Sequence, residues 1–203
     1  MYIDFDPLSP NQRYHLLTQT IIPRPIAWVL SENDDASLNL APFSFFNAMC
    51  SDPALLVMSI GKKPNGERKD TAKNIFSGRE FVVHIANVSM AAAVTTTSTT
   101  HEYGVSELDD VDLALTEFEG GNMPRLENCD IAYRCTLYEH HLVGPNEQAF
   151  IYAQAHSVYL SDSVATQNDR RISVDASKVN PLSRLGGSDF ADFGNSFTIK
   201  RPK

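Results

Sequence analysis

The residues best equipped for chemistry lie in a cationic loop between Gly61 and Lys73. Five basic side chains stand there against two acidic ones, although the whole chain carries a net charge of −8. Mobile cations, free backbone amides and a hydroxyl such as that of Thr71 are what a phosphate dianion requires. The loop therefore predicts a phosphate site, and a solvated surface loop is the alternative. The basic residues are Lys62, Lys63, Arg68, Lys69 and Lys73.

Asp70 complicates a phosphate site at this point. An aspartate at the start of a helix commonly caps the first backbone amides, and a phosphate would use the same amides. If phosphate binds here, we expect Arg68, Lys69 and the Thr71 hydroxyl to contribute more than the helix terminus.

A second candidate is the aromatic segment 39–47, which reads NLAPFSFFN. Three phenylalanines beside Ser44 and Asn47 suit a flat apolar slot with hydrogen-bonding edges, the kind of pocket that takes a heteroaromatic ring. A core strand that ends in a polar turn is the simpler interpretation by composition alone.

Arg24 and Trp28 precede that segment. Arg24 lies between Pro23 and Pro25, and the prolines fix the backbone that carries its side chain. A well-aimed arginine suits ligand binding or an interface equally well. Trp28 is the only tryptophan, and a core position is its simplest interpretation.

Several other kinds of site are not indicated. His140 and His141 are neighbours on an expected strand, so their side chains point to opposite faces and we expect no metal ion between them. The other histidines show no ligand spacing with Cys, Asp or Glu. The chain also lacks the G-x-S-x-G motif of serine hydrolases. It has neither G-x-G-x-x-G nor a P-loop motif for nucleotides.

Length and composition predict one domain, residues 1–203, with a sizeable core, since 42% of the residues are hydrophobic and 21% charged. The acidic balance argues against nucleic acid or an anionic membrane as partner. Three cysteines without a C-x-x-C pair suggest reduced thiols. Acidic residues near Met1 do not fit a secretory signal, and no apolar run reaches bilayer length. We expect a cytoplasmic protein.

The expected elements are mostly strands with short helices between them. Ser9 and Gln12 have capping-box spacing at the start of a helix that ends near Thr20. The segment 54–60 is apolar nearly throughout, so we expect both of its faces to be buried. Without regular alternation of strand and helix, the chain is predicted to be mainly β with helical insertions, as a barrel or sandwich. The other expected strands are 26–30, 37–44, 80–86, 131–143 and 149–160, and the other expected helices are 70–77 and 89–94.

Several segments, in their order and spacing, resemble the flavin reductase-like family and most of all its flavoredoxin-like branch. The resemblance extends from about Tyr14 to Phe190. The segments are PRPIAWV at 23–29, NLAPFSFFN at 39–47, SDP at 51–53, KDTAKNI at 69–75 and RLGGSDF at 184–190.

The resemblance implies an FMN-binding split β-barrel, a six-stranded antiparallel barrel of Greek-key type. It also implies a homodimer with FMN near the subunit interface. It assigns the phosphate to Lys69 and Thr71, with help from Arg68, and places Ser59 and Gly61 beside them. The resemblance further implies that the flavin is lined by Ser44, Phe45, Phe46 and Asn47, with Arg24 and Trp28 near the cofactor and Arg184 closing the site.

Two features depart from the family pattern. Members often carry a glycine in the second late strand, where this chain has FIYAQ at 150–154, and Tyr152 would narrow a ring pocket there. The threonine-rich stretch 95–100 is also unusual, and we expect it to border the site.

The function implied is an FMN-binding oxidoreductase of the flavin reductase type that takes hydride from NAD(P)H. Direct transfer from nicotinamide to flavin needs positioning more than acid–base groups, so no catalytic residue is nominated. The missing dinucleotide motif suggests that NAD(P)H docks transiently on an exposed flavin. The alternatives are a flavoredoxin-like electron-transfer protein with bound FMN and a protein partner, and a split barrel that has lost flavin.

Overall fold

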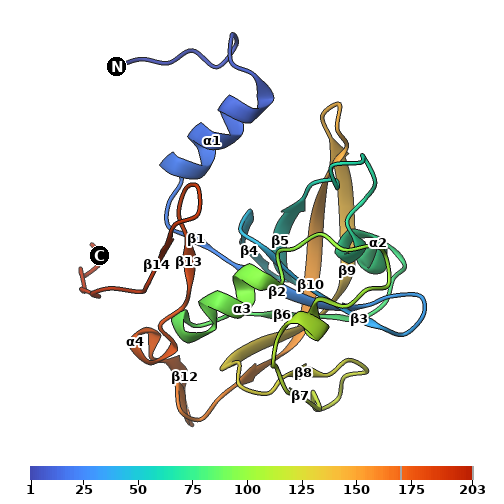
Figure 1. Cartoon of the computed structure of the whole chain (residues 1–203). Coiled ribbons are helices and arrows are strands. Elements are labelled where there is room, and N and C mark those ends of the chain that lie inside the picture. Colours follow the sequence, from blue (N-terminus) through green and yellow to red (C-terminus); the bar gives the residue numbers. More distant parts are fainter. Residues whose placement is uncertain (170, 203) are drawn as a thin grey trace.

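A seven-stranded antiparallel sheet forms the centre of the protein (Figure 1). The computed structural model describes residues 1–169 and 171–202. Within them the strands of this sheet follow the order β3-β2-β6-β9-β10-β5-β4. The strands are β2 (Ala27–Glu32), β3 (Leu38–Phe43), β4 (Phe46–Ser51), β5 (Ala54–Ile60), β6 (Phe81–His84), β9 (Ile131–Val143) and β10 (Gln148–Leu160).

The prediction of a mainly β chain with helical insertions is confirmed. The central sheet has one strand more than the six expected, because β4 adds to its edge beside β5. The two long late strands pair as predicted through the turn at Gly144, whose φ of +73° suits glycine. They make the long hairpin that rises at the upper right of Figure 1.

Strand β2 is buried on both faces, since Ala27 to Leu30 are fully inaccessible to solvent. Trp28 and Leu30 belong to one apolar cluster, while Ala27 and Val29 belong to another. Because neighbouring residues of a strand point to opposite sides, β2 separates the two halves of the core.

Strand β5 differs from the expectation that both of its faces are buried. Leu56, Met58 and Ile60 are buried, but Val57 and Ser59 on the opposite face are only half-buried. On that face Ser59 lines a cavity, so this side of β5 is partly open.

The helices lie around this sheet. Helix α1 (Pro10–Thr20) has the predicted capping box of Ser9 and Gln12, and it stands apart from the sheet in Figure 1. Gly78, at φ +82°, follows the end of α2 (Asp70–Phe76) as predicted. The expected helix at 89–94 is a 3₁₀ turn, η1 (Val88–Met90), that continues into α3 (Ala91–Thr96). A second 3₁₀ turn is η2 (Glu107–Asp110).

Short elements complete the structure. Strand β13 (Ser183–Arg184) pairs with both β1 (Arg24–Pro25) and β14 (Phe190–Ala191), so the C-terminal segment returns to the strand that precedes β2. No helix among the described residues is long and apolar enough to cross a membrane. The remaining elements are β7 (Leu115–Thr116), β8 (Arg125–Leu126), β11 (Ala165–Asn168), β12 (Arg171–Val174) and α4 (Ala176–Val179).

Candidate functional site

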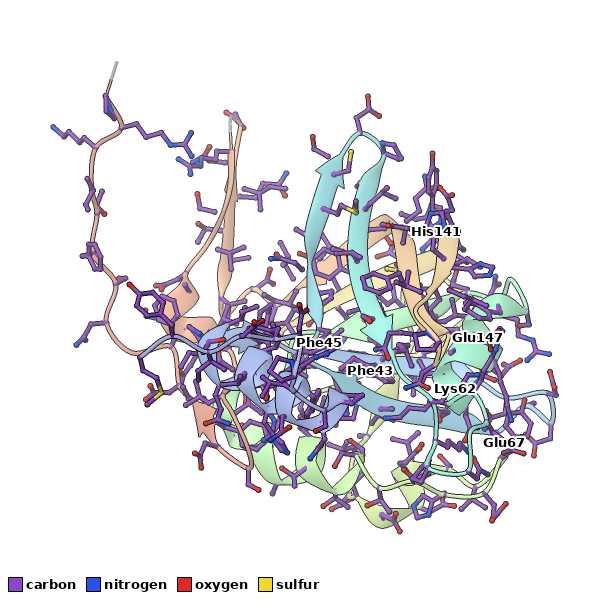
Figure 2. The ribbon with its side chains drawn as sticks, turned by 90° about the horizontal axis from the view of Figure 1, so that it is seen from above. Phe43, Phe45, Lys62, Glu67, His141 and Glu147 are labelled. Carbon is purple, nitrogen blue, oxygen red and sulfur yellow. The ribbon has the colours of Figure 1, made fainter. Side chains whose placement is uncertain are left out.

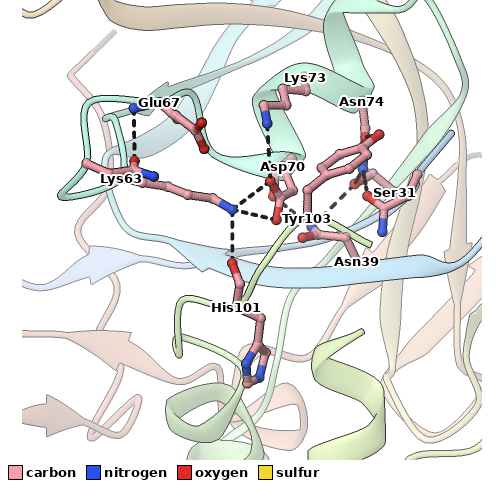
Figure 3. Close-up of polar contacts among 12 residues, drawn as sticks. Ser31, Asn39, Lys63, Glu67, Asp70, Lys73, Asn74, His101 and Tyr103 are labelled. Atoms are coloured by element: carbon pink, nitrogen blue, oxygen red, sulfur yellow. Dashed lines mark hydrogen bonds and ion pairs between the residues drawn. The ribbon is translucent and has the colours of Figure 1, made fainter. Parts of the chain in front are cut away.

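Buried side-chain amides fix helix α2 against strands β2 and β3. Asn39 donates a hydrogen bond to Thr71 Oγ1 at 2.9 Å, and Asn74 donates to Ser31 at 3.1 Å and to Asn33 at 2.8 Å. Figure 3 shows Asn74 on the helix, with Asn39 and Ser31 on the strand side of it. Because all five residues are buried, this network holds the start of α2 in one place relative to the sheet.

Asp70 does not cap helix α2, so the expectation that its side chain occupies the first amides is wrong. The N-cap residue is Lys69, and no side chain caps the helix. Asp70 instead forms an ion pair with Lys63 Nζ, at 2.9 Å to Oδ1 and 3.0 Å to Oδ2. Lys63 also donates to the His101 carbonyl at 3.0 Å (Figure 3). Both charged side chains are buried, and the pairing compensates charges that would be costly to bury alone.

Lys69 is the neighbouring cation that does not take part in the Lys63–Asp70 ion pair. Its side chain is half-buried, with Nζ 5.5 Å from the centre of the Phe43 ring. Within the described chain it has no hydrogen bond or ion pair with a protein group. Burial lowers the pKa of Lys69, nearby Lys63 lowers it further, and Glu107 partly opposes this. An ammonium held in this way has its donors free for an anion.

Lys69 lies on the wall between two hollows. The first is polar, and we call it the polar cavity. It brings together Lys69, Thr71 and the stretch 97–101, of which residues 97–100 were expected to border the site. Since Thr71 Oγ1 accepts from Asn39, its own proton is free to be donated. The lining residues are Asn39, Ala41, Pro42, Lys63, Lys69, Asp70, Thr71, Thr97, Ser98, Thr99, Thr100, His101 and Glu107.

The second hollow, the aromatic cavity, has a volume of about 420 Å³. Its apolar walls come from Phe43, Phe45 and Phe150, and Ser59 gives it a polar edge. In Figure 2, Phe45, Phe43 and Lys62 follow one another across the molecule. The remaining lining residues are Tyr14, Pro42, Ser44, Gly61, Lys62, Lys69 and Gln148.

A third hollow, of about 400 Å³, adjoins the other two. It shares Tyr14, Pro42 and Ser44 with the aromatic cavity and Ser98 with the polar one. Arg184 also lines it, with its guanidinium 4.5 Å from the centre of the Phe190 ring. Pro42 lines all three hollows, so they adjoin one another at this residue.

Ser59 and Gly61, both expected beside the phosphate loop, meet Gln148 in the aromatic cavity. Gln148 donates to Ser59 Oγ at 2.9 Å. A Cβ atom on Gly61 would lie 3.2 Å from the Gln148 amide oxygen, so the small residue leaves room for that side chain.

Arg24, Phe46 and Asn47 lie together around a separate cavity of about 320 Å³, which also includes Ser44 and Phe45. Arg24 is buried and donates to the carbonyls of Thr18, Ile21 and Leu185. These bonds tie α1 and the C-terminal segment to β1. Among the described residues, the Arg24 side chain thus donates to backbone carbonyls, and it does not line the polar cavity.

Trp28 and Arg68 line neither the polar nor the aromatic cavity. Trp28 is fully buried, and its indole donates to Thr97 Oγ1 at 2.8 Å, which fixes one residue of the polar wall. The Arg68 guanidinium lies 5.1 Å from the centre of the Phe76 ring, in an outer hollow with Lys73 and Tyr103. Adjacent cations, Arg68 and Lys69, therefore face different sides of α2.

Glu107 is a cavity residue that the sequence did not indicate. It begins η2, is only 4% exposed, and accepts a hydrogen bond from the Leu40 backbone amide at 3.0 Å. Burial raises its pKa, and the Leu40 bond partly opposes this. Tyr14, Gln148 and Phe150 were also not selected as site residues, because the folded chain brings them in from distant positions.

The residues present fit a phosphorylated aromatic ligand. Among the described residues, the half-buried Lys69 ammonium has no hydrogen-bonding protein partner; it lies in the polar cavity with a free hydroxyl, and aromatic walls stand directly beside it. Charge-assisted bonds of this kind hold phosphate, while flat apolar walls accept a ring system. The fold and this pair of cavities define the class as a mainly β protein with a polar cavity next to an aromatic one.

Comparison with known proteins assigns the family. The model of the flavin reductase like domain matches residues 19–172, and the chain belongs to that family. It is 34% identical to the uncharacterized protein YwrF of Bacillus subtilis (strain 168), in an alignment of 210 positions that covers 100% of both chains.

Solved structures agree with this assignment. Nitrilotriacetate monooxygenase component B from Bacillus cereus matches with a TM-score of 0.89 and 30% identity over 98% of each chain. 2-Nitrobenzoate 2-nitroreductase NbaA from Pseudomonas fluorescens matches with a TM-score of 0.88 and 27% identity, over 100% of this chain and 96% of that one. A split-barrel protein from Shewanella frigidimarina NCIMB 400 matches over 100% of both chains, with a TM-score of 0.83 and 18% identity. The predicted split-barrel fold is confirmed.

Proposed function

We propose that the chain is an FMN-dependent oxidoreductase that accepts hydride from NAD(P)H. The observation that carries this proposal is the half-buried Lys69 ammonium, which lines both the polar and the aromatic cavity and has no hydrogen-bonding partner in residues 1–169 and 171–202. Membership of the flavin reductase family supplies the identity of the ring. The phosphate supported by this geometry is that of FMN, because FMN is the flavin whose ribityl chain ends in a terminal phosphate.

The chain's own residues bind and orient the cofactor. Lys69 and the Thr71 hydroxyl hold the phosphate in the polar cavity, and Asn39 keeps that hydroxyl aimed. Phe43 and Phe45 supply apolar walls for the ring. Ser44 lies where the aromatic cavity and its neighbour meet, so it is placed to bond the edge of the ring system.

A bound flavin supplies the redox chemistry, since it accepts a hydride from reduced nicotinamide. The protein contributes position and electrostatics. Lys69 and Arg184 provide positive charge around the cavities, which favours the negative charge of reduced flavin. We assign no acid or base, because direct hydride transfer does not need one. The electrons then pass to an acceptor outside this chain.

We further propose a homodimer, formed through α1 and β4. Strand β4 lies at the edge of the sheet, and its side chains from Asn47 onward are exposed. Leu17 and Ile21 of α1 and Met49 of β4 are all exposed apolar residues. The cavity lined by Arg24 and Asn47 opens between these elements, so a second copy would cover residues of the candidate site. We also propose a cytoplasmic location, which suits a chain whose three cysteines are free thiols.

The experiment that tests the redox proposal is anaerobic stopped-flow mixing of FMN-loaded protein with NADH and with NADPH. The flavin absorbance should bleach with at least one of the two donors, at a rate that depends on its concentration. Flavin that stays oxidised with both donors, yet is reduced by dithionite, would contradict the NAD(P)H-dependent activity. That outcome would favour a flavoredoxin-like electron carrier, whose electrons come from a protein partner.

A further inference from the structure

Glu107 is an acidic residue in a cavity assigned to a phosphate. Glu107 lines the polar cavity together with Lys69 and Thr71, and it is only 4% exposed. One oxygen, Oε2, accepts the Leu40 amide at 3.0 Å. No ion pair involving Glu107 occurs among the residues that the structure describes. The redox proposal gives this carboxyl no part to play.

The charges around the cavity decide what Glu107 does to an anion. Lys63 on the loop is matched by Asp70 on α2, through contacts of 2.9 and 3.0 Å. His101 on the 97–101 stretch lies 2.6 Å from the Asp110 carboxylate of η2, a contact that is an ion pair only when the imidazole is protonated. Lys69 is the remaining cation and Glu107 the remaining anion of the wall. With Glu107 ionised, the wall has no excess positive charge to offer a dianion.

Protonation changes this balance. A neutral Glu107 leaves Lys69 as a net positive charge, and its new O–H becomes a donor in place of a repelling oxygen. The carboxyl keeps its bond from Leu40 in either state, since Oε2 still accepts. Burial already disfavours the charged form, so the pKa of Glu107 is raised before any ligand enters.

We propose that Glu107 takes up a proton from solvent when a flavin phosphate enters the polar cavity. This inference rests on the proposed FMN site and adds a specificity-determining residue to it. FMN binding then becomes coupled to pH, because the ionised carboxylate offsets the charge of Lys69 and repels the phosphate dianion. Riboflavin, which lacks the phosphate, brings no charge and binds without proton uptake. Glu107 thereby sets how tightly FMN is held relative to riboflavin as pH rises.

The sign of the coupling follows from linkage. The dianion raises the pKa of Glu107 further in the complex, so the bound state holds more protons than the free state. FMN affinity is highest where Glu107 is already protonated. Above the pKa that Glu107 has in the free protein, the affinity weakens by up to about tenfold for each pH unit. The second pKa of a phosphate monoester is near 6, so the charge of the FMN phosphate changes little above about pH 7.

The variant Glu107→Gln separates these effects. Glutamine keeps an oxygen that accepts from Leu40 and remains neutral at every pH. Glu102→Gln is the matched control, because it removes the same charge from an exposed residue of the neighbouring loop. Dissociation constants for FMN and riboflavin are measured by flavin fluorescence from about pH 7 to about pH 9, at fixed ionic strength. Proton uptake is measured by calorimetry in two buffers with different ionisation enthalpies.

Wild type and Glu102→Gln should bind FMN more weakly as pH rises, with uptake of up to about one proton. Glu107→Gln should bind FMN at least about tenfold more tightly than wild type at the high-pH end, without that uptake. Riboflavin affinity should differ by less than about twofold among the three proteins.

Proton uptake that persists in Glu107→Gln would assign the proton to Lys69 and overturn the inference. Equal weakening of FMN and riboflavin in that variant would also overturn it, because the carboxylate would then be holding groups common to both flavins. If the variant does not fold, proton uptake on FMN binding is measured with wild type alone. FMN binding without proton uptake would then overturn the inference. Failure of wild type to bind FMN at all would instead refute the proposed cofactor.

Discussion

Replacing Lys69 by methionine isolates the charge that the proposed phosphate site depends on. Methionine keeps an unbranched apolar stem against Phe43, whereas alanine would also empty part of the wall. Because the ammonium has no hydrogen bond to any residue that the structure describes, its loss leaves none of their acceptors unpaired. Burial already lowers the pKa of Lys69, so removing the charge should not lower the stability of the free protein.

The expected loss of affinity is that of one charge-assisted hydrogen bond. Such bonds contribute about 1.5 to 3 kcal/mol, which corresponds to a dissociation constant for FMN that is about 10- to 150-fold larger. Riboflavin should lose less than about threefold, since it carries no phosphate. The difference between the two flavins therefore measures the contact with the phosphate and not a general loss of fold.

Arg68→Met is the matched control, because it removes an adjacent cation that faces Phe76 outside both cavities. Titration of wild type and of both variants with FMN and with riboflavin, followed by fluorescence, gives the six constants required. We expect Arg68→Met to bind FMN within about threefold of wild type at physiological salt, where exposed charges are screened. Equal losses for FMN and riboflavin in Lys69→Met, or a larger FMN-specific loss in Arg68→Met, would refute the placement.

Three further predictions concern stability and assembly. Asp70→Asn leaves the Lys63 ammonium buried without its carboxylate and should lower the free energy of unfolding by about 3 to 5 kcal/mol; an unchanged thermal midpoint would show that the pair is not needed. Burial lowers the pKa of His84 to about 4, so the stability from its neutral ring is complete above about pH 6.5 and is lost as pH falls toward 4. Urea unfolding should show about 2 kcal/mol less stability at about pH 5 than at about pH 7.5, and a flat profile would contradict this. Met49→Lys places a charge on the exposed edge strand and should convert a dimer to monomer in sedimentation equilibrium; a dimer that persists would exclude β4 from the interface.

The elements that the sequence predicted well are those with strong local signals. Ser9 and Gln12 specify the start of α1, and Gly78 specifies the end of α2. The two long late strands are apparent from their length and from the turn between them. The edge strand β4 was not expected, because its exposed side chains lack the alternation that marks a half-buried strand.

The candidate site was predictable where its residues are close in sequence. Lys69 and Thr71 follow directly from the loop and the family motif, and the structure places both on one cavity wall. The partner of Asp70 was not predictable, since loop charge alone does not reveal which lysine is paired and which is free. Glu107 and Gln148 depend on contacts between distant segments, which no local pattern records.

A crystal structure of the protein with FMN tests the central claim most directly. We expect phosphate oxygens within hydrogen-bonding distance of Lys69 Nζ and Thr71 Oγ1, with the flavin ring against the walls that Phe43 and Phe45 provide. FMN bound with its phosphate against Arg68 and Lys73 in the outer hollow would contradict that claim.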